Sequence, residues 1–267
     1  MKPNQSSDLS QAIRAALLTG DKRGKVMQTR ALVRSWRRGD LATGFSAAMP
    51  DHPAWPDGLE VLSPARMPRR GKGGSERSRI ALWHALAHIE FVAIDLALDI
   101  VGRFGAAMGE HFVADFLGVA ADEAMHFALI ERHLASMGAT YGDLPVHDGL
   151  WQSAADTAHA IDARLAIVPM VLEARGLDVT PATLGRIRSQ GDVRGVEILQ
   201  RILDDEIRHV RAGSTHFDAW CTENGQNPQN HWKMLVKRHF RGAIKSPFND
   251  SARLAAGLSR EMYQIVA

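Results

Sequence analysis

The chain has 267 residues, of which 45% are apolar and 23% charged, and its formal net charge is +2. This composition is typical of a soluble globular protein that buries a core. The single cysteine, Cys221, excludes an intrachain disulfide and a Cys-x-x-Cys metal knuckle, so any bound metal must be held by His, Asp and Glu.

Positive charge is concentrated towards both ends of the sequence. Residues 1–75 contain 13 Lys/Arg and 6 Asp/Glu, and residues 225–267 contain 7 and 2, which leaves an acidic middle. An acidic middle suits a site that collects cations. The basic flanks fit an anionic partner such as nucleic acid, although a solvated surface that packs against the acidic middle is the interpretation we favour.

The N-terminal sequence is polar and contains no apolar segment of the kind found in signal peptides. No apolar run is long enough to cross a bilayer. We therefore expect a cytoplasmic protein that does not associate with membranes.

The first third of the chain predicts two short helices followed by an extended segment. Residues 8–18 and 21–36 have helical patterns, and the first has an apolar stripe that includes Leu9 and Ile13. Residues 39–75 are rich in Pro and Gly, which cannot sustain a helix, and predict an extended connection.

Four long helical patterns follow, with no convincing strand between them. They cover residues 76–104, 108–137, 153–175 and 193–223, and glycines stand near the ends of the first three. Loops are expected at 138–152 and at 176–192, where Pro181 begins a short helix, and either loop could help to form a substrate pocket. The tail predicts two short helices separated by Ser246-Pro247.

These elements predict an all-α protein built around a four-helix bundle. We expect a helical and extended N-terminal extension at 1–75, the bundle at 76–224 and a helical C-terminal extension at 225–267.

Two of the long helices contain the motif Glu-x-x-His. Glu123 precedes His126 in the second helix, and Glu206 precedes His209 in the fourth. Side chains three residues apart lie on the same face of a helix, one turn apart. Each pair can bind one metal ion, and each glutamate can also bridge to a second ion, so Glu123 and Glu206 are the candidate catalytic residues.

The first and third helices each carry a glutamate in an apolar stretch, Glu90 and Glu173. Burying an ionised carboxylate is costly unless it is paired or bound to metal. Glu90 stands 33 residues before Glu123, and Glu173 stands 33 residues before Glu206. The sequence therefore predicts a two-metal centre with six ligands, which are Glu90, Glu123, His126, Glu173, Glu206 and His209.

This ligand pattern resembles that of the ferritin-like di-iron and di-manganese carboxylate proteins. Four segments of residues 65–220, with the sequences AHIEFVAIDLALD, DEAMHF, LEARGLD and DEIRHV, resemble an uncharacterised bacterial family of ferritin-like proteins. That family is distantly related to rubrerythrins and to the hydroxylase of isopentenyl-adenosine in tRNA. The resemblance implies a ferritin-like bundle with two iron ions, or manganese ions, as cofactor.

The resemblance also implies residues that support the ligands. A metal-bound histidine usually donates its second ring N–H to a carboxylate. By similarity to the larger di-iron oxygenases, Asp122 would serve His209 and Asp205 would serve His126. His88, inside the family motif, is either a supporting residue or part of a polar face.

Two further residues of the third helix have expected roles. Arg175 would neutralise surplus carboxylate charge or hold an anionic substrate group, and we favour the first role. Pro169, four residues before Glu173, predicts a kink or bulge.

We therefore expect an oxidoreductase, an oxidase or hydroxylase that uses O₂ or peroxide on an unidentified organic substrate, with RNA among the candidates. A metal-handling protein, a peroxide-detoxifying protein similar to manganese catalase, and a non-enzymatic RNA-binding module with a structural metal remain alternatives. A tyrosyl radical role is disfavoured, because Tyr141 is expected in a loop and Tyr263 in the tail. A homodimer is expected from the general frequency of such assemblies.

Overall fold

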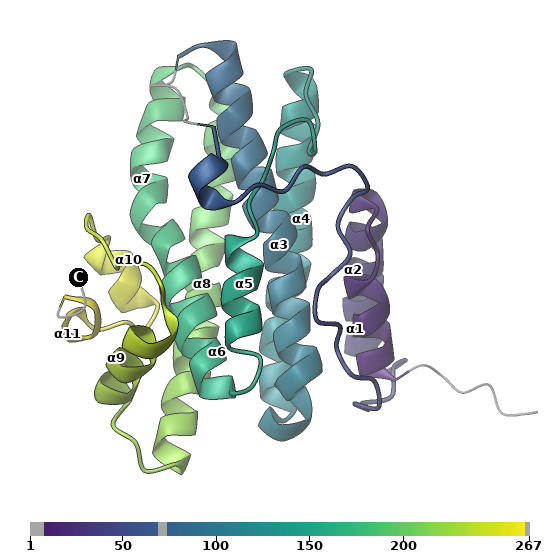
Figure 1. Ribbon diagram of the computed structural model, residues 1–267, viewed down its shortest axis with the longest axis vertical. Coiled ribbons are helices and arrows are strands. Elements are labelled where there is room, and N and C mark those ends of the chain that lie inside the picture. Colours follow the sequence, from purple (N-terminus) through teal and green to yellow (C-terminus); the bar gives the residue numbers. More distant parts are fainter. Residues whose placement is uncertain (1–7, 69–73, 265–267) are drawn as a thin grey trace, which may run out of the picture. The chain divides into compact units, whose positions relative to one another are not determined.

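The computed structural model describes residues 8–68 and 74–264, which fold into helices and connecting segments (Figure 1). Within these residues there is no strand, only two isolated β-bridges, and the predicted all-α class is confirmed. The same residues include no helix that is both long and apolar enough to span a membrane. The chain divides into two compact units, Met1–Gly149 and Leu150–Ala267.

The N-terminal unit begins with two short helices, α1 (Leu9–Leu17) and α2 (Lys22–Arg37), which lie close to the predicted ranges. An aspartate stands before each helix. The carboxylates of Asp8 and Asp21 accept hydrogen bonds from backbone N–H groups of the first turns, which would otherwise lack partners. The buried apolar stripe of α1 packs against α2 and the long helix that follows.

The described part of residues 38–75 forms the predicted extended connection, with one 3₁₀ turn, η1 (Pro64–Arg66). Side chains of the helices hold this connection in place. The Nζ atom of Lys25 donates to the carbonyl of Ala54 at 2.9 Å, and Arg103 donates to another carbonyl of the connection at 2.7 Å. These contacts give the segment a defined path although it has almost no secondary structure.

Two long helices, α3 (Glu76–Met108) and α4 (Glu110–Ser136), form an antiparallel hairpin in the N-terminal unit (Figure 1). The chain turns at Gly109, whose φ of 85° favours glycine. The prediction that the first helix stops near Gly105 is wrong, because the helix continues for another turn. Gly105 instead makes room for the ring of Phe45, since a Cβ at this position would lie 2.6 Å from that ring.

The C-terminal unit differs most from the predicted elements. The third predicted helix is divided among α5 (Gly149–Asp156), α6 (Ile161–Ile167) and a π-helical turn, η2 (Val168–Glu173). Pro169 is the second residue of this turn and has no N–H for an α-helical hydrogen bond. The bulge predicted at this proline is therefore confirmed.

Helix α7 (Ala174–Ser189) continues from η2 through Gly176 and Pro181. The predicted helix end at Gly176, and the loop beyond it, are therefore wrong. Because Pro181 has no N–H, it leaves the carbonyl of Leu177 without its helical donor. The side-chain amide of Asn249 donates to that carbonyl at 3.2 Å, so a contact from a distant segment compensates for the proline.

The last long helix, α8 (Val193–Glu223), has the predicted bounds. The carboxylate of Asp192 accepts a hydrogen bond from the backbone N–H of Gly195 at 2.7 Å, which caps the first turn. Helix α8 packs against α6, η2 and α7.

In the tail as far as residue 264, three short helices follow where two were predicted: α9 (Pro228–His239), α10 (Asp250–Ala255) and α11 (Arg260–Tyr263). Arg253 of α10 forms a buried bidentate ion pair with Asp178 of α7, with N–O distances of 2.8 and 2.7 Å. This pair fixes the C-terminal segment to the rest of its unit.

Candidate metal centre

Three of the predicted ligands lie together in the N-terminal unit. Glu90 comes from α3, and Glu123 and His126 come from adjacent turns of α4. The Nδ1 atom of His126 lies 3.3 Å from a carboxylate oxygen of Glu90 and 3.4 Å from one of Glu123. One potential ligand atom from each residue lies within 4.8 Å of the other two. We call these three residues the α3–α4 cluster.

The α3–α4 cluster is buried and crowded with carboxylate oxygens. Glu123 and His126 have no exposed surface, and Glu90 is 4% exposed. Burial, followed by repulsion from Glu123, raises the pKa of Glu90 well above its ordinary range. A cation between the carboxylates would remove both penalties, and carboxylate oxygens with an imidazole suit iron or manganese. The residues therefore fit a metal ion.

Two further predicted ligands lie together in the C-terminal unit. Glu206 and His209 stand one turn apart on α8, with 3.7 Å between a carboxylate oxygen and Nδ1. His209 is buried and Glu206 is partly exposed. We call these two residues the α8 pair. Glu173 is the last residue of η2, which packs against α8.

Gly213 allows this close packing of η2 on α8. A Cβ at Gly213 would lie 2.4 Å from the Cβ of Pro169, far closer than a real contact. The missing side chain of the glycine on α8 thus leaves the space that the ring of the proline on η2 occupies. The π-helical turn that ends at Glu173 is held directly against the helix that carries the α8 pair.

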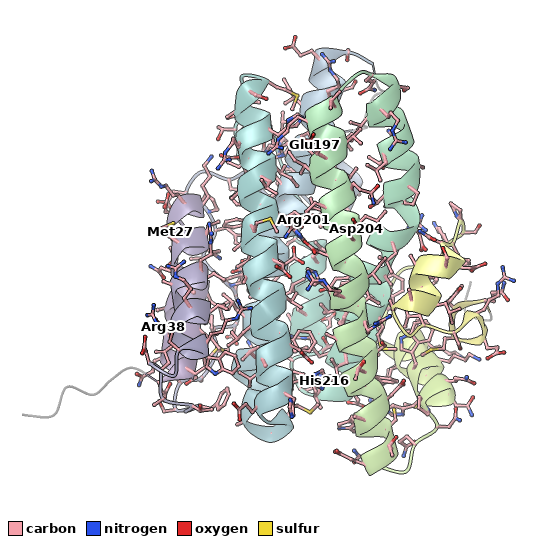
Figure 2. The ribbon with its side chains drawn as sticks, turned by 180° about the vertical axis from the view of Figure 1, so that it is seen from behind. Met27, Arg38, Glu197, Arg201, Asp204 and His216 are labelled. Atoms are coloured by element: carbon pink, nitrogen blue, oxygen red, sulfur yellow. The ribbon has the colours of Figure 1, made fainter. Side chains whose placement is uncertain are left out.

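Asp205, one of the two expected supporting aspartates, is bonded by arginines. Asp205 accepts hydrogen bonds from Arg201 at 3.0 Å and from Arg208 at 2.5 Å, both on its own helix. Figure 2 shows Arg201 on α8 between the labelled residues Glu197 and Asp204. The expected pairing of Asp205 with His126, and of Asp122 with His209, joins residues of different units and stays a prediction.

The structure places Arg175 beside the C-terminal segment. Its guanidinium donates to the carbonyl of Lys245 at 2.6 Å and lies 3.6 Å from the carboxylate of Asp178. Since Asp178 already pairs with Arg253, this arginine belongs to the polar contacts that hold the tail on α7. The expected effect of Arg175 on the charge of the metal ligands stays a prediction.

His88 uses both ring nitrogens within the N-terminal unit. Its Nε2 lies 3.0 Å from the carbonyl of His147, which can only accept, so Nε2 carries the proton. Its Nδ1 therefore accepts the hydroxyl hydrogen of Tyr141 at 2.8 Å. Burial lowers the pKa of His88 to about 4.

Tyr141 lies in the predicted loop, but it is buried against two phenylalanines that neighbour the proposed ligands in sequence. It is 3% exposed, and its ring lies 5.2 Å from Phe91 and 5.4 Å from Phe127. These phenylalanines directly follow the ligands Glu90 and His126 in sequence. No sequence signal marks this position, because the path of the loop depends on tertiary contacts, such as the hydrogen bond that the backbone N–H of Tyr141 donates to the carboxylate of Glu131.

A buried ion pair that was not predicted from the sequence lies on another face of α3. Lys25 and Asp95 have no exposed side-chain surface, and their charged atoms are 2.5 Å apart. The indole of Trp55 donates to the second oxygen of Asp95 at 3.3 Å. Burial raises the pKa of Asp95 to about 6, although Lys25 acts in the opposite direction.

Comparisons with known proteins identify relatives without an assigned activity. An uncharacterised protein of Haemophilus influenzae is 39% identical over 213 residues, which cover 78% of this chain and 74% of that protein. No solved structure matches the chain. Neither match is described as a ferritin or rubrerythrin, and a relation to those proteins stays a prediction. Because residues 18–264 match its pattern, the chain belongs to the family described as "Protein of unknown function (DUF455)".

Proposed function

We propose that this protein is a dimetal-carboxylate oxidoreductase, which holds two iron or two manganese ions and uses O₂ or peroxide to oxidise an organic substrate. The observation that supports this most directly is the buried α3–α4 cluster, in which two carboxylates and an imidazole converge. Buried carboxylates without a cation are costly, so a structural explanation of the cluster would need other compensation.

We further propose that the α3–α4 cluster, the α8 pair and Glu173 share the two ions. The support is the repeated sequence pattern, in which a lone glutamate precedes Glu-x-x-His by the same 33 residues in each half. Glu90, Glu123, Glu173 and Glu206 would hold the ions together with His126 and His209. Such metal ions supply redox chemistry with O₂ or peroxide when bound.

The chain itself contributes a dry and fixed environment for this chemistry. Around the α3–α4 cluster the neighbouring residues Phe91, Ala124 and Phe127 are buried. Exclusion of water strengthens electrostatic interactions between the ligands and a bound cation. Glu90 and Glu123 lie on long packed helices, which also limits the movement of their side chains.

Metal content gives the first test. We expect about two iron or manganese ions per chain after purification and anaerobic loading, measured by elemental analysis. Glu123→Gln should lose metal, because an amide oxygen carries no charge, whereas Glu110→Gln, at an exposed position of the same helix, should keep it. Loss of one ion in Glu123→Gln and the other in Glu206→Gln would show independent sites and contradict the shared centre.

Oxygen measurements distinguish the proposed reaction from its alternative. The reduced iron form should consume O₂ or peroxide, and Glu123→Gln should not. Vigorous O₂ release from peroxide by the manganese form would instead favour a catalase-like activity. A loaded protein that neither consumes O₂ nor reacts with peroxide would contradict the proposal.

A further inference from the structure

Helix α2 carries a stripe of arginines on its exposed side. Its 16 residues include no Asp or Glu. Arg23, Arg30, Arg34 and Arg37 are exposed and follow one another at intervals of seven, four and three residues, which places them on one face of the helix. The stripe extends over about 21 Å at the helical rise of 1.5 Å per residue. We call these four residues the α2 stripe.

The charges of the α2 stripe are not neutralised by the described part of the chain. The neighbouring Lys22 pairs with Glu131, and Arg38 pairs with Asp40. Among residues 8–68 and 74–264, none of the four stripe arginines forms an ion pair. Figure 2 labels Met27 on α2 and Arg38 just beyond the end of this helix, and Met27 is 53% exposed between the first two arginines.

An open hollow of about 250 Å³ lies near the end of α2. Two partly exposed aromatic side chains, Trp36 and Phe45, line it together with Thr43 and Glu110. Phe45 lies against Gly105 of α3, so the hollow depends on the absence of a Cβ there.

The hollow and the α2 stripe approach each other along α4. The guanidinium of Arg37 lies 4.0 Å from where a Cβ of Gly118 would stand, and Val113 lines the hollow. These two positions of α4 are five residues apart, about 7.5 Å along the helix axis. A flexible chain that contacts Arg37 can therefore also reach the hollow.

We propose that the α2 stripe and this hollow bind single-stranded nucleic acid, with phosphates on the arginines and a base against Trp36 and Phe45. A row of cations along one helix face matches a phosphate backbone, and an open aromatic surface matches the flat face of an unpaired base. Bases of a duplex are stacked inside it and cannot enter such a hollow. This inference does not depend on the proposed metal chemistry.

A membrane surface fits the same helix less well. Amphipathic helices that bind bilayers insert an apolar face. The apolar side chains of α2, including Val26, Leu32 and Val33, are already buried within the unit. Besides the partly exposed Trp36, Met27 is the one large apolar side chain of this helix that is exposed.

Fluorescence anisotropy with a labelled single-stranded RNA of 12 nucleotides tests the proposal on the full chain, with and without a metal chelator. Affinity should fall with salt, with a log–log slope of about −3 for four phosphate contacts at about −0.7 each. The variant R23Q/R30Q/R34Q/R37Q should bind at least about tenfold more weakly and with a flatter slope.

A matched variant controls for net charge. R186Q/R188Q/K237Q/R238Q removes four exposed positive charges from other helices and should bind RNA as the unsubstituted protein does. Equal losses in the two quadruple variants would overturn the proposal, because affinity would then follow overall charge alone.

The aromatic hollow has its own test. Trp36→Leu keeps apolar bulk but removes the stacking surface, and should weaken binding about tenfold without changing the salt slope. If single-stranded DNA binds as well as RNA, the site recognises unpaired bases and phosphates, which both nucleic acids have. If RNA binds more tightly, the natural ligand of the site is RNA. Tighter binding of a duplex, or binding of phosphatidylserine vesicles without binding of nucleic acid, would overturn the proposal.

Discussion

Lys25 and Asp95 show how strongly a single residue can affect the stability of the fold when both charges of an ion pair are buried. The lysine donates to Asp95 and to the carbonyl of Ala54, so one ammonium group links α2, α3 and the extended connection. Its charge also lies 4.9 Å from the centre of the Phe91 ring. Removal of one partner would leave the other charge buried and uncompensated.

We therefore predict that Lys25→Met lowers the free energy of unfolding by about 3–5 kcal/mol, measured in urea. The double variant K25M/D95L should recover most of this loss, because it buries no charge. Arg38→Met breaks the exposed pair with Asp40 and should cost less than about 1 kcal/mol. A double variant as unstable as Lys25→Met would contradict this explanation.

His88 predicts a pH dependence of stability. Its pKa in the folded state is about 4, below the ordinary 6.5, because burial favours the neutral ring. Its contribution is therefore complete above about pH 6.5 and is lost as the pH falls towards 4, by up to about 3 kcal/mol. Asp95, with a raised pKa of about 6, acts in the opposite direction over this range.

A comparison of variants separates these two effects. His88→Gln keeps one donor and one acceptor but does not titrate, so its unfolding free energy should fall less than that of the unsubstituted protein between pH 6.5 and pH 4. The difference between the two curves isolates the histidine. Parallel curves would show that His88 does not contribute to the acid sensitivity.

At the scale of elements, the packing of η2 on α8 depends on Gly213. Gly213→Ala would place a methyl group 2.4 Å from Pro169, so we predict a loss of about 1–3 kcal/mol in unfolding free energy. Gly185→Ala is the matched control, because nothing lies within 4 Å of a Cβ at this exposed helical position. It should stabilise the protein by up to about 1 kcal/mol through helix propensity. Similar effects of the two substitutions on chemical denaturation would refute the close-packing argument.

Elements with strong local signals were predictable from the sequence. Helix α8 has an N-cap, a long amphipathic pattern and a glycine after its end, and its bounds agree with the prediction. Helix α7 was not predictable, because Gly176 and Pro181 are local stop signals that the contact between Asn249 and Leu177 overrides. The same distinction applies to the candidate site.

The residues of the α3–α4 cluster were predictable because spacing of three residues on one helix fixes Glu123 and His126 on one face. Their closeness to Glu90 is the part that the structure adds. The burial of Tyr141 was not predictable, because a loop residue has no periodic pattern that reports its burial. Convergence of all six ligands on two ions stays a prediction.

At the scale of the whole molecule, the carboxylates of the proposed metal site would increase the affinity for metal but lower the stability of the metal-free protein. Glu90 and Glu123 repel each other when no cation lies between them, and proton uptake by Glu90 relieves part of this cost. Ions that bind the folded chain alone stabilise it by about 2.7 kcal/mol at a hundred times the dissociation constant. Under the proposed function, a bound metal would therefore turn an unfavourable cluster of carboxylates into a favourable one.

We therefore predict that Glu123→Gln reverses the order of stability. Without metal, this variant should melt at or above the temperature of the unsubstituted protein, because one buried negative charge is gone. With saturating Mn(II), or Fe(II) under anaerobic conditions, the unsubstituted protein should melt at the higher temperature. Because protons compete with metal for Glu90, the amount by which metal stabilises the unsubstituted protein should also decrease as the pH falls from 7.5 to 5.5. Thermal scans of both proteins check each point, and a variant that is less stable in the absence of metal would show that Glu123 holds the fold together rather than a cation.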